Sequence, residues 1–157
     1  MFPSEITDFF KDQPTPFYYY DLDVLQKTLN QIKEYGLSKG FKVHFALKAN
    51  NHPRLLQQIR KAGLGADCVS GGEVSRALEC DFPSQDIAFA GVGKSDQEIE
   101  LGLKHDIFCF NCESEQELEV LDKLARKHGK VARIALRINP NVAADTHEYI
   151  TTGLNEN

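Results

Sequence analysis

Val43-His44-Phe45-Ala46-Leu47-Lys48-Ala49-Asn50 is a short, mostly apolar stretch that ends in an amine and an amide. As a β-strand over residues 43–49, it would send its even-numbered side chains to one face and its odd-numbered side chains to the other. Lys48 would then be the last inward side chain, next to small neighbours. An ammonium buried without a counter-charge tends to deprotonate, and a neutral amine is a nucleophile toward carbonyl groups. Lys48 is therefore a candidate catalytic residue. The plainer alternative is a lysine that lies just past the strand and is exposed to solvent.

Strand-like and helix-like segments alternate regularly after this stretch. The expected strands cover residues 43–49, 66–70, 87–91, 107–112 and 131–139, and the helices between them cover residues 53–62, 72–80, 95–104 and 114–128. Residues typical of helix starts stand where this order needs them, namely Pro53, Ser95 or Asp96, and Ser114 followed by Glu117 in a capping box. Such alternation predicts an α/β fold with a parallel sheet and right-handed crossovers.

Two α/β architectures have this period, an open doubly wound sheet and a (β/α)8 barrel. A barrel gathers functional groups from the carboxyl ends of several strands at one mouth, whereas a doubly wound sheet concentrates them at one switch point. Polar or charged side chains stand at or near such ends on separate strands, namely Lys48, Asp67, Asn111 and Arg137. This spread favours the barrel.

A complete barrel of this type needs about 250 residues, and this chain has 157. We therefore expect a partial (β/α)8 TIM barrel of about five strands, cut from a longer protein. The unpaired edge strands of this partial barrel would make it prone to associate with other chains. Ahead of the barrel, the aromatic segment Pro16–Asp21 is expected to form a strand. A helix is expected to start at Val24, behind Asp23 as N-cap, and to run to Tyr35.

The composition is that of one ordinary globular unit, with 41% hydrophobic and 26% charged residues. A net charge of -5 argues against nucleic acid or an anionic membrane as the main partner. No apolar run approaches the roughly 18 residues of a membrane span, and the first residues lack the features of a secretory signal. The expected compartment is the cytoplasm.

The cysteines and histidines do not suggest a metal site. Cys109 and Cys112 have the CxxC spacing, but residues three apart in a strand face opposite sides and cannot chelate one ion together. Cys68 and Cys80 have no second pair at zinc spacing, so all the thiols are expected to be reduced and buried. The histidines show no i,i+4 pair around a glutamate. No metal is expected.

Glycine motifs in this chain resemble nucleotide-binding loops without fitting them. In Gly91-Val92-Gly93-Lys94-Ser95, the first glycine of a phosphate-binding loop would fall at Ala88, within an expected strand. A turn before a capped helix is the better interpretation, with Lys94 near the barrel mouth. Gly63 and Gly65 precede their strand, which is the wrong order for dinucleotide binding. The pair at 71–72 opens a helix, where its N–H groups could face an anion or simply form a tight turn.

Several motifs stand in the same order as in one known family and cover almost the whole chain. They are Thr15-Pro16-Phe17-Tyr18-Tyr19-Tyr20-Asp21, Phe45-Ala46-Leu47-Lys48-Ala49-Asn50, Gly63-Leu64-Gly65-Ala66-Asp67-Cys68-Val69-Ser70-Gly71-Gly72-Glu73, Ala90-Gly91-Val92-Gly93-Lys94-Ser95, Asn111-Cys112-Glu113-Ser114, Leu136-Arg137-Ile138-Asn139-Pro140 and Thr146-His147-Glu148-Tyr149-Ile150-Thr151-Thr152-Gly153. By these motifs the chain resembles the N-terminal portion of the fold-type-III pyridoxal-phosphate decarboxylases, a family that includes diaminopimelate, ornithine and arginine decarboxylases. The segment Val69–Glu73 has the form usual for the diaminopimelate decarboxylases.

The resemblance implies a cofactor and roles for individual residues. Lys48 matches the lysine that holds pyridoxal 5'-phosphate in a Schiff base and helps to exchange it for the substrate amine. Asp67, Glu73 and Arg137 match positions that line the cofactor region. The family's phosphate cradle and its partner for the pyridine nitrogen lie beyond Asn157, so we expect this chain alone to be inactive.

The resemblance also implies a reaction and an assembly. The expected activity of the full-length enzyme is decarboxylation of meso-2,6-diaminopimelate, a small amino-acid substrate, to L-lysine and CO2 in the last step of lysine biosynthesis, by a homodimer. Residues 1–22 would add a strand to a C-terminal β-domain, and residues 23–157 would form the incomplete cofactor-binding barrel. The alternatives are a carboxynorspermidine, ornithine or arginine decarboxylase, a pyridoxal-dependent racemase, and a non-catalytic fragment that binds a partner.

Overall fold

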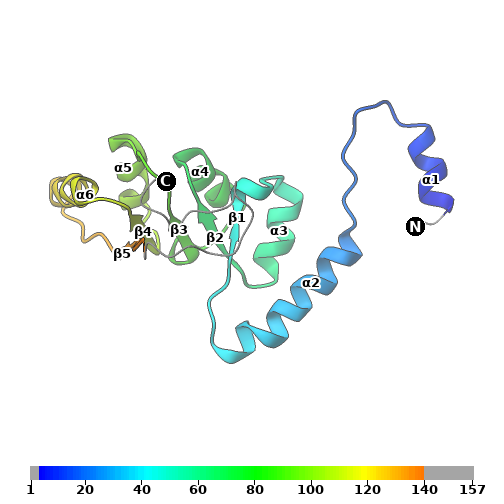
Figure 1. Ribbon diagram of the computed structural model, residues 1–157, viewed down its shortest axis with the longest axis horizontal. Helices are drawn as coiled ribbons and strands as arrows, with labels where there is room; N and C mark the ends of the chain where they lie inside the picture. Colours follow the sequence, from blue (N-terminus) through cyan, green and yellow to red (C-terminus); the bar gives the residue numbers. More distant parts are fainter. Residues whose placement is uncertain (1–3, 140–157) are drawn as a thin grey trace.

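Five parallel strands form one sheet in the computed structural model, which describes residues 4–139 (Figure 1). In chain order they are β1 His44–Ala46, β2 Gly65–Cys68, β3 Ile87–Phe89, β4 Cys109–Cys112 and β5 Ile134–Leu136. Each strand pairs with the next one along the chain, so the sheet order is β1-β2-β3-β4-β5. A doubly wound sheet reverses its order at a switch point, whereas this sheet does not. The sequential order confirms the prediction of a partial barrel.

Four helices alternate with these strands and follow one another around one side of the sheet (Figure 1). They are α3 Pro53–Lys61, α4 Gly71–Glu79, α5 Asp96–Lys104 and α6 Glu115–Lys127. A short η3 turn, Ser84–Asp86, precedes β3. Each helix begins and ends within two residues of its predicted bounds, because Pro53 and the serine caps mark the starts in the sequence itself. None of the helices within residues 4–139 has the length and apolar character needed to cross a membrane.

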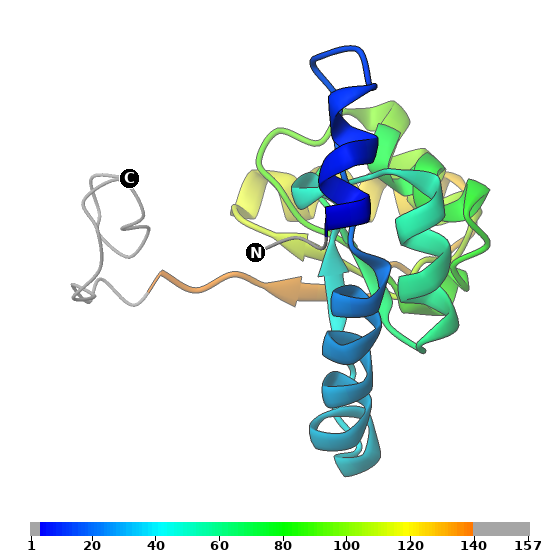
Figure 2. The ribbon, with the colours of Figure 1, turned by 90° about the vertical axis from the view of Figure 1, so that its right-hand side faces the viewer.

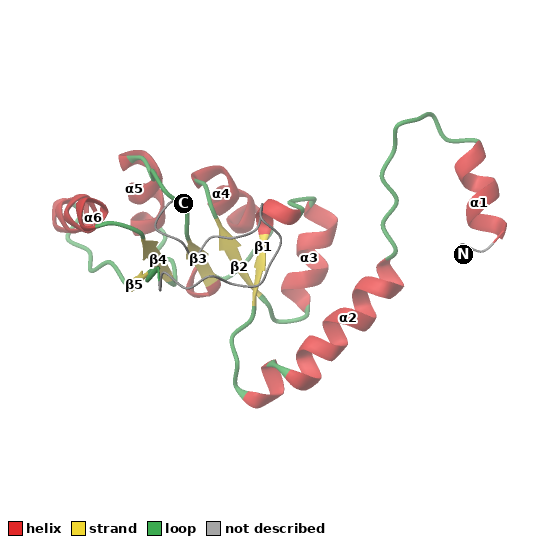
Figure 3. Ribbon diagram, viewed as in Figure 1, coloured by secondary structure: helices red, strands yellow, loops and turns green. Residues whose placement is uncertain are grey.

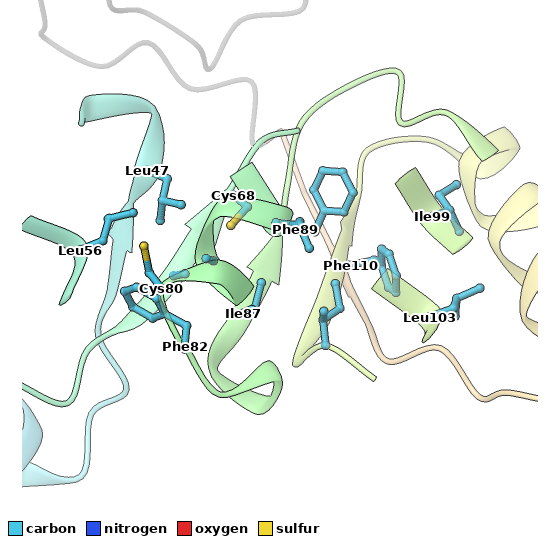
Figure 4. Close-up of a cluster of buried hydrophobic side chains, with 14 of the residues drawn as sticks. Leu47, Leu56, Cys68, Cys80, Phe82, Ile87, Phe89, Ile99, Leu103 and Phe110 are labelled. Carbon is cyan, nitrogen blue, oxygen red and sulfur yellow. The ribbon is translucent and has the colours of Figure 1, made fainter. Parts of the chain in front are cut away.

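The core lies between the sheet and these helices (Figure 4). Ile87 and Phe89 of β3 are almost fully buried there, and the Phe89 ring lies 6.1 Å from the ring of Phe110 on β4. Leu56 of α3 and Ile99 of α5 cover the strands from the helix side. Burial of one such side chain contributes about 2 kcal/mol to stability. This packed layer holds the ends of the strands in place, and with them the loops that follow the strands.

The opposite face of the sheet carries smaller and more polar side chains. The register aligns Ala46 with Asp67, Asp67 with Ala88, and Ala88 with Cys109, so this layer runs across four strands. It corresponds to the interior of a barrel, and Asp67 and Cys109 are only half-buried in it. At the far edge, Ile134 and Leu136 of β5 remain 45% and 58% exposed, because no helix follows β5 within the described part of the chain.

The N-terminal region differs from its prediction. Residues 17–21 lie outside any strand, and two helices flank them, α1 Ser4–Lys11 and α2 Leu22–Tyr35 (Figure 3). The aromatic composition suggested a strand, but a strand also needs a neighbouring strand for its backbone hydrogen bonds, which composition alone does not supply. Both helices lie beyond the β1 edge of the sheet (Figure 2). One short η1 turn, Leu37–Lys39, follows α2.

The cap of α2 is also different from the predicted one. Asp21, and not Asp23, is the N-cap, because one Asp21 carboxylate oxygen accepts hydrogen bonds from the backbone N–H groups of Asp23 and Val24 at 3.0 Å each. The helix therefore begins at Leu22, two residues before the predicted start. Two aspartates two residues apart are equally good caps by residue type, so only the backbone geometry distinguishes them.

Two serine caps behave differently although their sequences look alike. Ser95 and Glu98 form the complete capping box at the start of α5. Ser114 accepts from the Glu117 N–H at 3.2 Å, but the Glu117 carboxylate does not return to Ser114. It instead accepts from the Glu113 N–H and pairs with Lys94. The predicted capping box of α6 is therefore only half formed.

Glu98 also links α5 to α4, and this bond predicts a pH-dependent stability. Its carboxylate accepts from the Gly71 N–H at 2.7 Å and from the Ser95 N–H and hydroxyl. The Gly71 hydrogen bond, followed by those of Ser95, lowers the pKa of Glu98 below its ordinary value. A lowered pKa means that the stabilisation is present above the unfolded-state pKa and is lost as pH falls through the folded-state pKa.

We expect Glu98→Gln to lower the free energy of unfolding by about 1 kcal/mol near neutral pH. The difference from the parent chain should shrink toward zero as pH falls through the lowered folded-state pKa of Glu98, because protonation then removes the same charge from the parent. Urea unfolding at several pH values measures this. Glu119→Gln, on the exposed face of α6, is the matched control and should show no such trend. An equal loss at both ends of the pH range would contradict the prediction.

Candidate active site

Lys48 lies immediately after β1, on the single turn η2 that covers Leu47–Ala49. The predicted strand over 43–49 is therefore too long, because the strand ends at Ala46. Leu47 points into the core and is almost fully buried, and this anchor turns the backbone so that Lys48 projects at the carboxyl end of the sheet. Of the two interpretations of Lys48, the solvent-exposed lysine just past the strand is the one that the structure shows, and the buried inward position is wrong. The Lys48 side chain is exposed, since five strands leave the inner face of the sheet open.

A polar pocket of about 320 Å³ surrounds Lys48. Its lining residues come from the aromatic N-terminal segment, the turn after β1 and the first turn of α4, namely Tyr18, Tyr20, Leu47, Lys48, Ala49, Asn50, Asn51 and Glu73. Within residues 4–139 the Lys48 ammonium has no hydrogen-bond or ion-pair partner. An exposed amine at the edge of a pocket can be reached by the carbonyl group of a ligand, and it reacts with that carbonyl once it has lost its proton.

Asn50 holds one wall of this pocket in place. Its side-chain amide donates to the Tyr20 hydroxyl at 3.2 Å, and its carbonyl oxygen accepts from the His52 N–H at 2.9 Å. The Tyr20 ring also packs against the ring of His52, with centroids 5.6 Å apart. Sequence reasoning did not include Tyr20 or Asn50 in the site. The contact joins residues thirty positions apart, and no local pattern indicates it.

Glu73, which only the family resemblance connected with the cofactor, lines the same pocket as Lys48. It stands in the first turn of α4, where Ser70 caps the helix by accepting from the Glu73 N–H at 3.2 Å. One Glu73 carboxylate oxygen accepts from the Val69 N–H at 2.8 Å. This bond folds the side chain back over the strand-to-helix turn, so that a negative charge lines the same pocket as the exposed Lys48 amine.

Asp67 lies on β2, opposite Ala46 of β1, and is half-buried on the inner face. It is therefore one strand away from the Lys48 turn and on the face that a barrel would enclose. Farther down that face, His44 stacks on Phe108 with ring centroids 5.7 Å apart. Burial lowers the pKa of His44, while the negative charges of Asp86 and Asp67 act in the opposite direction.

Arg137 follows β5 at the opposite edge of the sheet from Lys48. Four strand spacings separate β1 from β5, which is roughly 19 Å measured along the sheet. The Arg137 guanidinium donates to a Glu113 carboxylate oxygen at 2.8 Å. The described residues thus place Lys48 and Glu73 in one pocket and Asp67 on the neighbouring strand β2. Arg137 lies at a separate point of the rim, which is the row of loops that follow the carboxyl ends of the strands.

Lys94 is the second lysine of this rim, and its environment is the reverse of that of Lys48. Its side chain is only 2% exposed, and its ammonium donates to two backbone carbonyls and to Glu117. An ammonium has three protons to donate, and all three are used. Lys94 is therefore not free to bind a phosphate, which agrees with the rejection of a phosphate-binding loop here.

Cysteine chemistry does not contribute to this pocket. Cys109 and Cys112 lie on opposite faces of β4, as predicted, with Cys112 buried under the helices. Burial raises the pKa of Cys68 to about 12, with smaller effects from the negative charges of Glu73 and Asp67. Within residues 4–139, no group of three histidine, cysteine, aspartate or glutamate side chains could hold a metal ion.

Comparisons with known proteins agree with one another. The sequence profile of a family described as "pyridoxal-dependent decarboxylase, pyridoxal binding domain" matches residues 22–157. The chain is 54% identical over 151 residues to a diaminopimelate decarboxylase of Bacteroides thetaiotaomicron, and the match covers 96% of this chain and 39% of that protein.

Solved structures give the same relationship. A crystal structure of diaminopimelate decarboxylase from Helicobacter pylori, complexed with L-lysine, superposes with a TM-score of 0.88 at 44% identity, covering 97% of this chain and 39% of that one. The arginine decarboxylase of Paramecium bursaria Chlorella virus has a TM-score of 0.74 at 20% identity, over 98% of this chain and 41% of that one. The second likeness shows the fold alone. This chain spans about two-fifths of the length of these relatives.

Proposed function

Because this chain belongs to the pyridoxal-dependent decarboxylase family through that family's pyridoxal binding domain, we propose that it supplies the lysine-bearing part of a diaminopimelate decarboxylase. The complete protein would release CO2 from meso-2,6-diaminopimelate and form L-lysine. One observation carries this proposal: the Lys48 amine stands accessible and unpaired at a polar pocket, in the segment that the family profile matches. A primary amine in that position is what pyridoxal phosphate requires of its protein.

The residues around Lys48 fit that cofactor and its substrate. Pyridoxal phosphate, when bound, supplies an electron sink for the bond to the departing carboxylate. We propose that Lys48 binds the cofactor's carbonyl carbon and afterwards moves protons as a base. Glu73 and Asp67 would place negative charge near the cofactor and the substrate ammonium, and Arg137 would face the cofactor from the far side of the mouth. Asn50 and Tyr20 would orient the wall of the pocket.

The choice of diaminopimelate rests on the degree of similarity. Relatives named diaminopimelate decarboxylase are 54% and 43% identical to this chain over nearly its whole length, whereas the viral arginine decarboxylase is 20% identical. Substrate selection within one fold depends on the side chains that touch the distal group of the substrate. We therefore propose meso-2,6-diaminopimelate over ornithine, arginine and carboxynorspermidine.

We also propose that the complete protein is a cytoplasmic homodimer and that this segment alone does not turn over. The half-open inner face and the exposed β5 edge support the second point, since a site built from a whole barrel mouth has only part of its walls here. Size-exclusion chromatography with light scattering measures the assembly of the complete protein. A monomer with full activity would contradict the proposed homodimer.

An assay of CO2 release tests the proposed function directly. The complete protein is supplied with pyridoxal phosphate and, in parallel, with meso-2,6-diaminopimelate, ornithine or arginine. We expect kcat/KM for diaminopimelate to exceed the other values by at least about 1,000-fold, because a site that pairs with the distal ammonium and carboxylate leaves its polar groups unpaired with the wrong substrate. Faster turnover of ornithine or arginine would overturn the proposed substrate. Interconversion of diaminopimelate stereoisomers without CO2 would indicate a racemase instead.

A further inference from the structure

Lys94 is held by an unusually complete set of contacts at the end of β3. Its ammonium donates to the Gly91 carbonyl at 2.8 Å, to the Asn111 carbonyl at 2.8 Å and to Glu117 at 2.6 Å, and it lies 5.4 Å from the centre of the Phe89 ring. The turn before it depends on Gly91, which has a φ of +100° and whose Cβ, if present, would lie 3.0 Å from the Val69 carbonyl oxygen. These contacts therefore hold the Lys94 side chain in one position at the rim.

The contacts continue from Lys94 to Arg137 without a break. The second carboxylate oxygen of Glu117 accepts from the Glu113 N–H at 2.9 Å. The Glu113 carboxylate accepts from the Gly91 N–H at 3.2 Å with one oxygen and from Arg137 at 2.8 Å with the other. The side chains of Lys94, Glu117 and Glu113 are only 2%, 13% and 12% exposed, whereas that of Arg137, at the end of this chain of contacts, is 57% exposed.

Charge balance makes the four side chains depend on one another. Two cations, Lys94 and Arg137, face two carboxylates, Glu117 and Glu113. Removal of the Lys94 charge would leave the Glu117 carboxylate, which is only 13% exposed, without its cation, and a poorly solvated unpaired charge is costly. Within residues 4–139 the Arg137 side chain bonds only to Glu113, so its position depends on where Glu113 is held.

We propose that Lys94 and Glu117 are positioning residues for the active site, which hold Glu113 and, through Glu113, the guanidinium of Arg137 toward the cofactor. The inference rests on the proposed function, because it gives Arg137 a place beside pyridoxal phosphate. It also accounts for the Gly91-Val92-Gly93-Lys94-Ser95 motif, whose lysine is used inside the rim and not for a nucleotide phosphate.

Lys94→Met in the complete protein tests this positioning role. We expect cofactor affinity or kcat/KM for diaminopimelate to fall by roughly tenfold to a hundredfold, the usual consequence of a small displacement of a site residue. Lys130→Met is the matched control, because Lys130 forms an ion pair with Asp106 away from this chain of contacts, and it should leave both values unchanged. The thermal midpoint of each variant records any loss of stability separately.

A double-mutant cycle with Glu113→Gln distinguishes positioning from a merely structural role. If Lys94 acts through Glu113, adding Lys94→Met to Glu113→Gln should change kcat/KM by less than about twofold, because the path is already broken. A structural lysine would reduce kcat/KM by the same factor in both backgrounds. The full effect in the Glu113→Gln background, or parent kinetics for Lys94→Met, would overturn the proposal.

A second variant covers the case in which Lys94→Met does not fold. Lys94→Met combined with Glu117→Leu replaces the buried ion pair by apolar side chains, which proteins often accept. This variant should fold and still show the loss in kcat/KM, since the Glu113 N–H has lost its acceptor; parent kinetics would overturn the proposal. The activity of the parent protein distinguishes a failure of the positioning role from a failure of the proposed function. An active parent with equally active variants refutes only the positioning role, whereas a parent that releases no CO2 refutes the proposed function and this inference with it.

Discussion

Lys48→Ala is expected to abolish the covalent attachment of pyridoxal phosphate and to lower kcat for CO2 release on the order of 1,000-fold, equivalent to about 4 kcal/mol of transition-state stabilisation. The reason is chemical. The Lys48 amine is the accessible, unpaired nucleophile at the pocket, whereas Lys94 on the same rim has all its protons committed. Alanine offers no nitrogen to bond the cofactor's carbonyl carbon or to carry a proton.

Borohydride reduction makes the attachment permanent and allows it to be mapped. After incubation with pyridoxal phosphate, reduction and digestion, the parent protein should yield one dominant phosphopyridoxyl peptide, the one that contains Lys48. Lys61→Ala is the control, because Lys61 is an exposed lysine at the far end of α3 and its loss should change neither the peptide nor the activity. A dominant modified peptide elsewhere, or an unchanged adduct in Lys48→Ala, would remove Lys48 from its role.

Gly65→Ala is expected to have the largest effect on stability, about 3 kcal/mol. A Cβ at Gly65 would lie 2.4 Å and 2.6 Å from ring atoms of His44 and 2.5 Å from the backbone carbonyl oxygen of Asp86. The carbonyl belongs to the turn before β3 and cannot move aside without disturbing the β2–β3 pairing. Urea unfolding of this chain measures the change in the free energy of unfolding.

Gly72→Ala is the matched control for that substitution. Its Cβ would find no atom closer than 3.8 Å, and it lies in the first turn of α4, where alanine is the better helix former by about 1 kcal/mol. It should therefore leave the stability unchanged or raise it slightly. Adding His44→Ala to Gly65→Ala should restore only part of the loss, because the Asp86 carbonyl remains. Full restoration would show that the ring, and not the backbone, makes the contact that matters.

Regular elements could be predicted from the sequence because their signals are local. Ile87 and Phe89, on either side of a small residue, indicate strand β3, and Ser95 with Glu98 three residues later indicates the start of α5. These patterns need only neighbours a few residues away. The segment Pro16–Asp21 shows the limit, because aromatic composition favours a strand but the pairing partner must come from another part of a protein.

Site residues could be predicted in part. Lys48 was named from its strand-end position and the family resemblance, and Glu73 from the resemblance alone, and the two side chains line one pocket. The sequence left Lys48 either as the last inward residue of a strand or as an exposed lysine just past it, and the turn at Leu47 decides for the exposed position. Sequence reasoning missed Tyr20, Asn50 and Glu113, whose roles depend on bonds across twenty or more residues.

The amino-acid sequence, with no coordinates, was enough to determine an alternating α/β chain from its periodicity, and a candidate lysine and the family from its short motifs. Tertiary contacts decided the rest. Whether a rim lysine is an accessible nucleophile, as at Lys48, or a buried support, as at Lys94, depends on which acceptors the fold brings within reach. Glu117, twenty-three residues from Lys94, makes that difference, because a buried ammonium is stable only beside a charge that another element supplies.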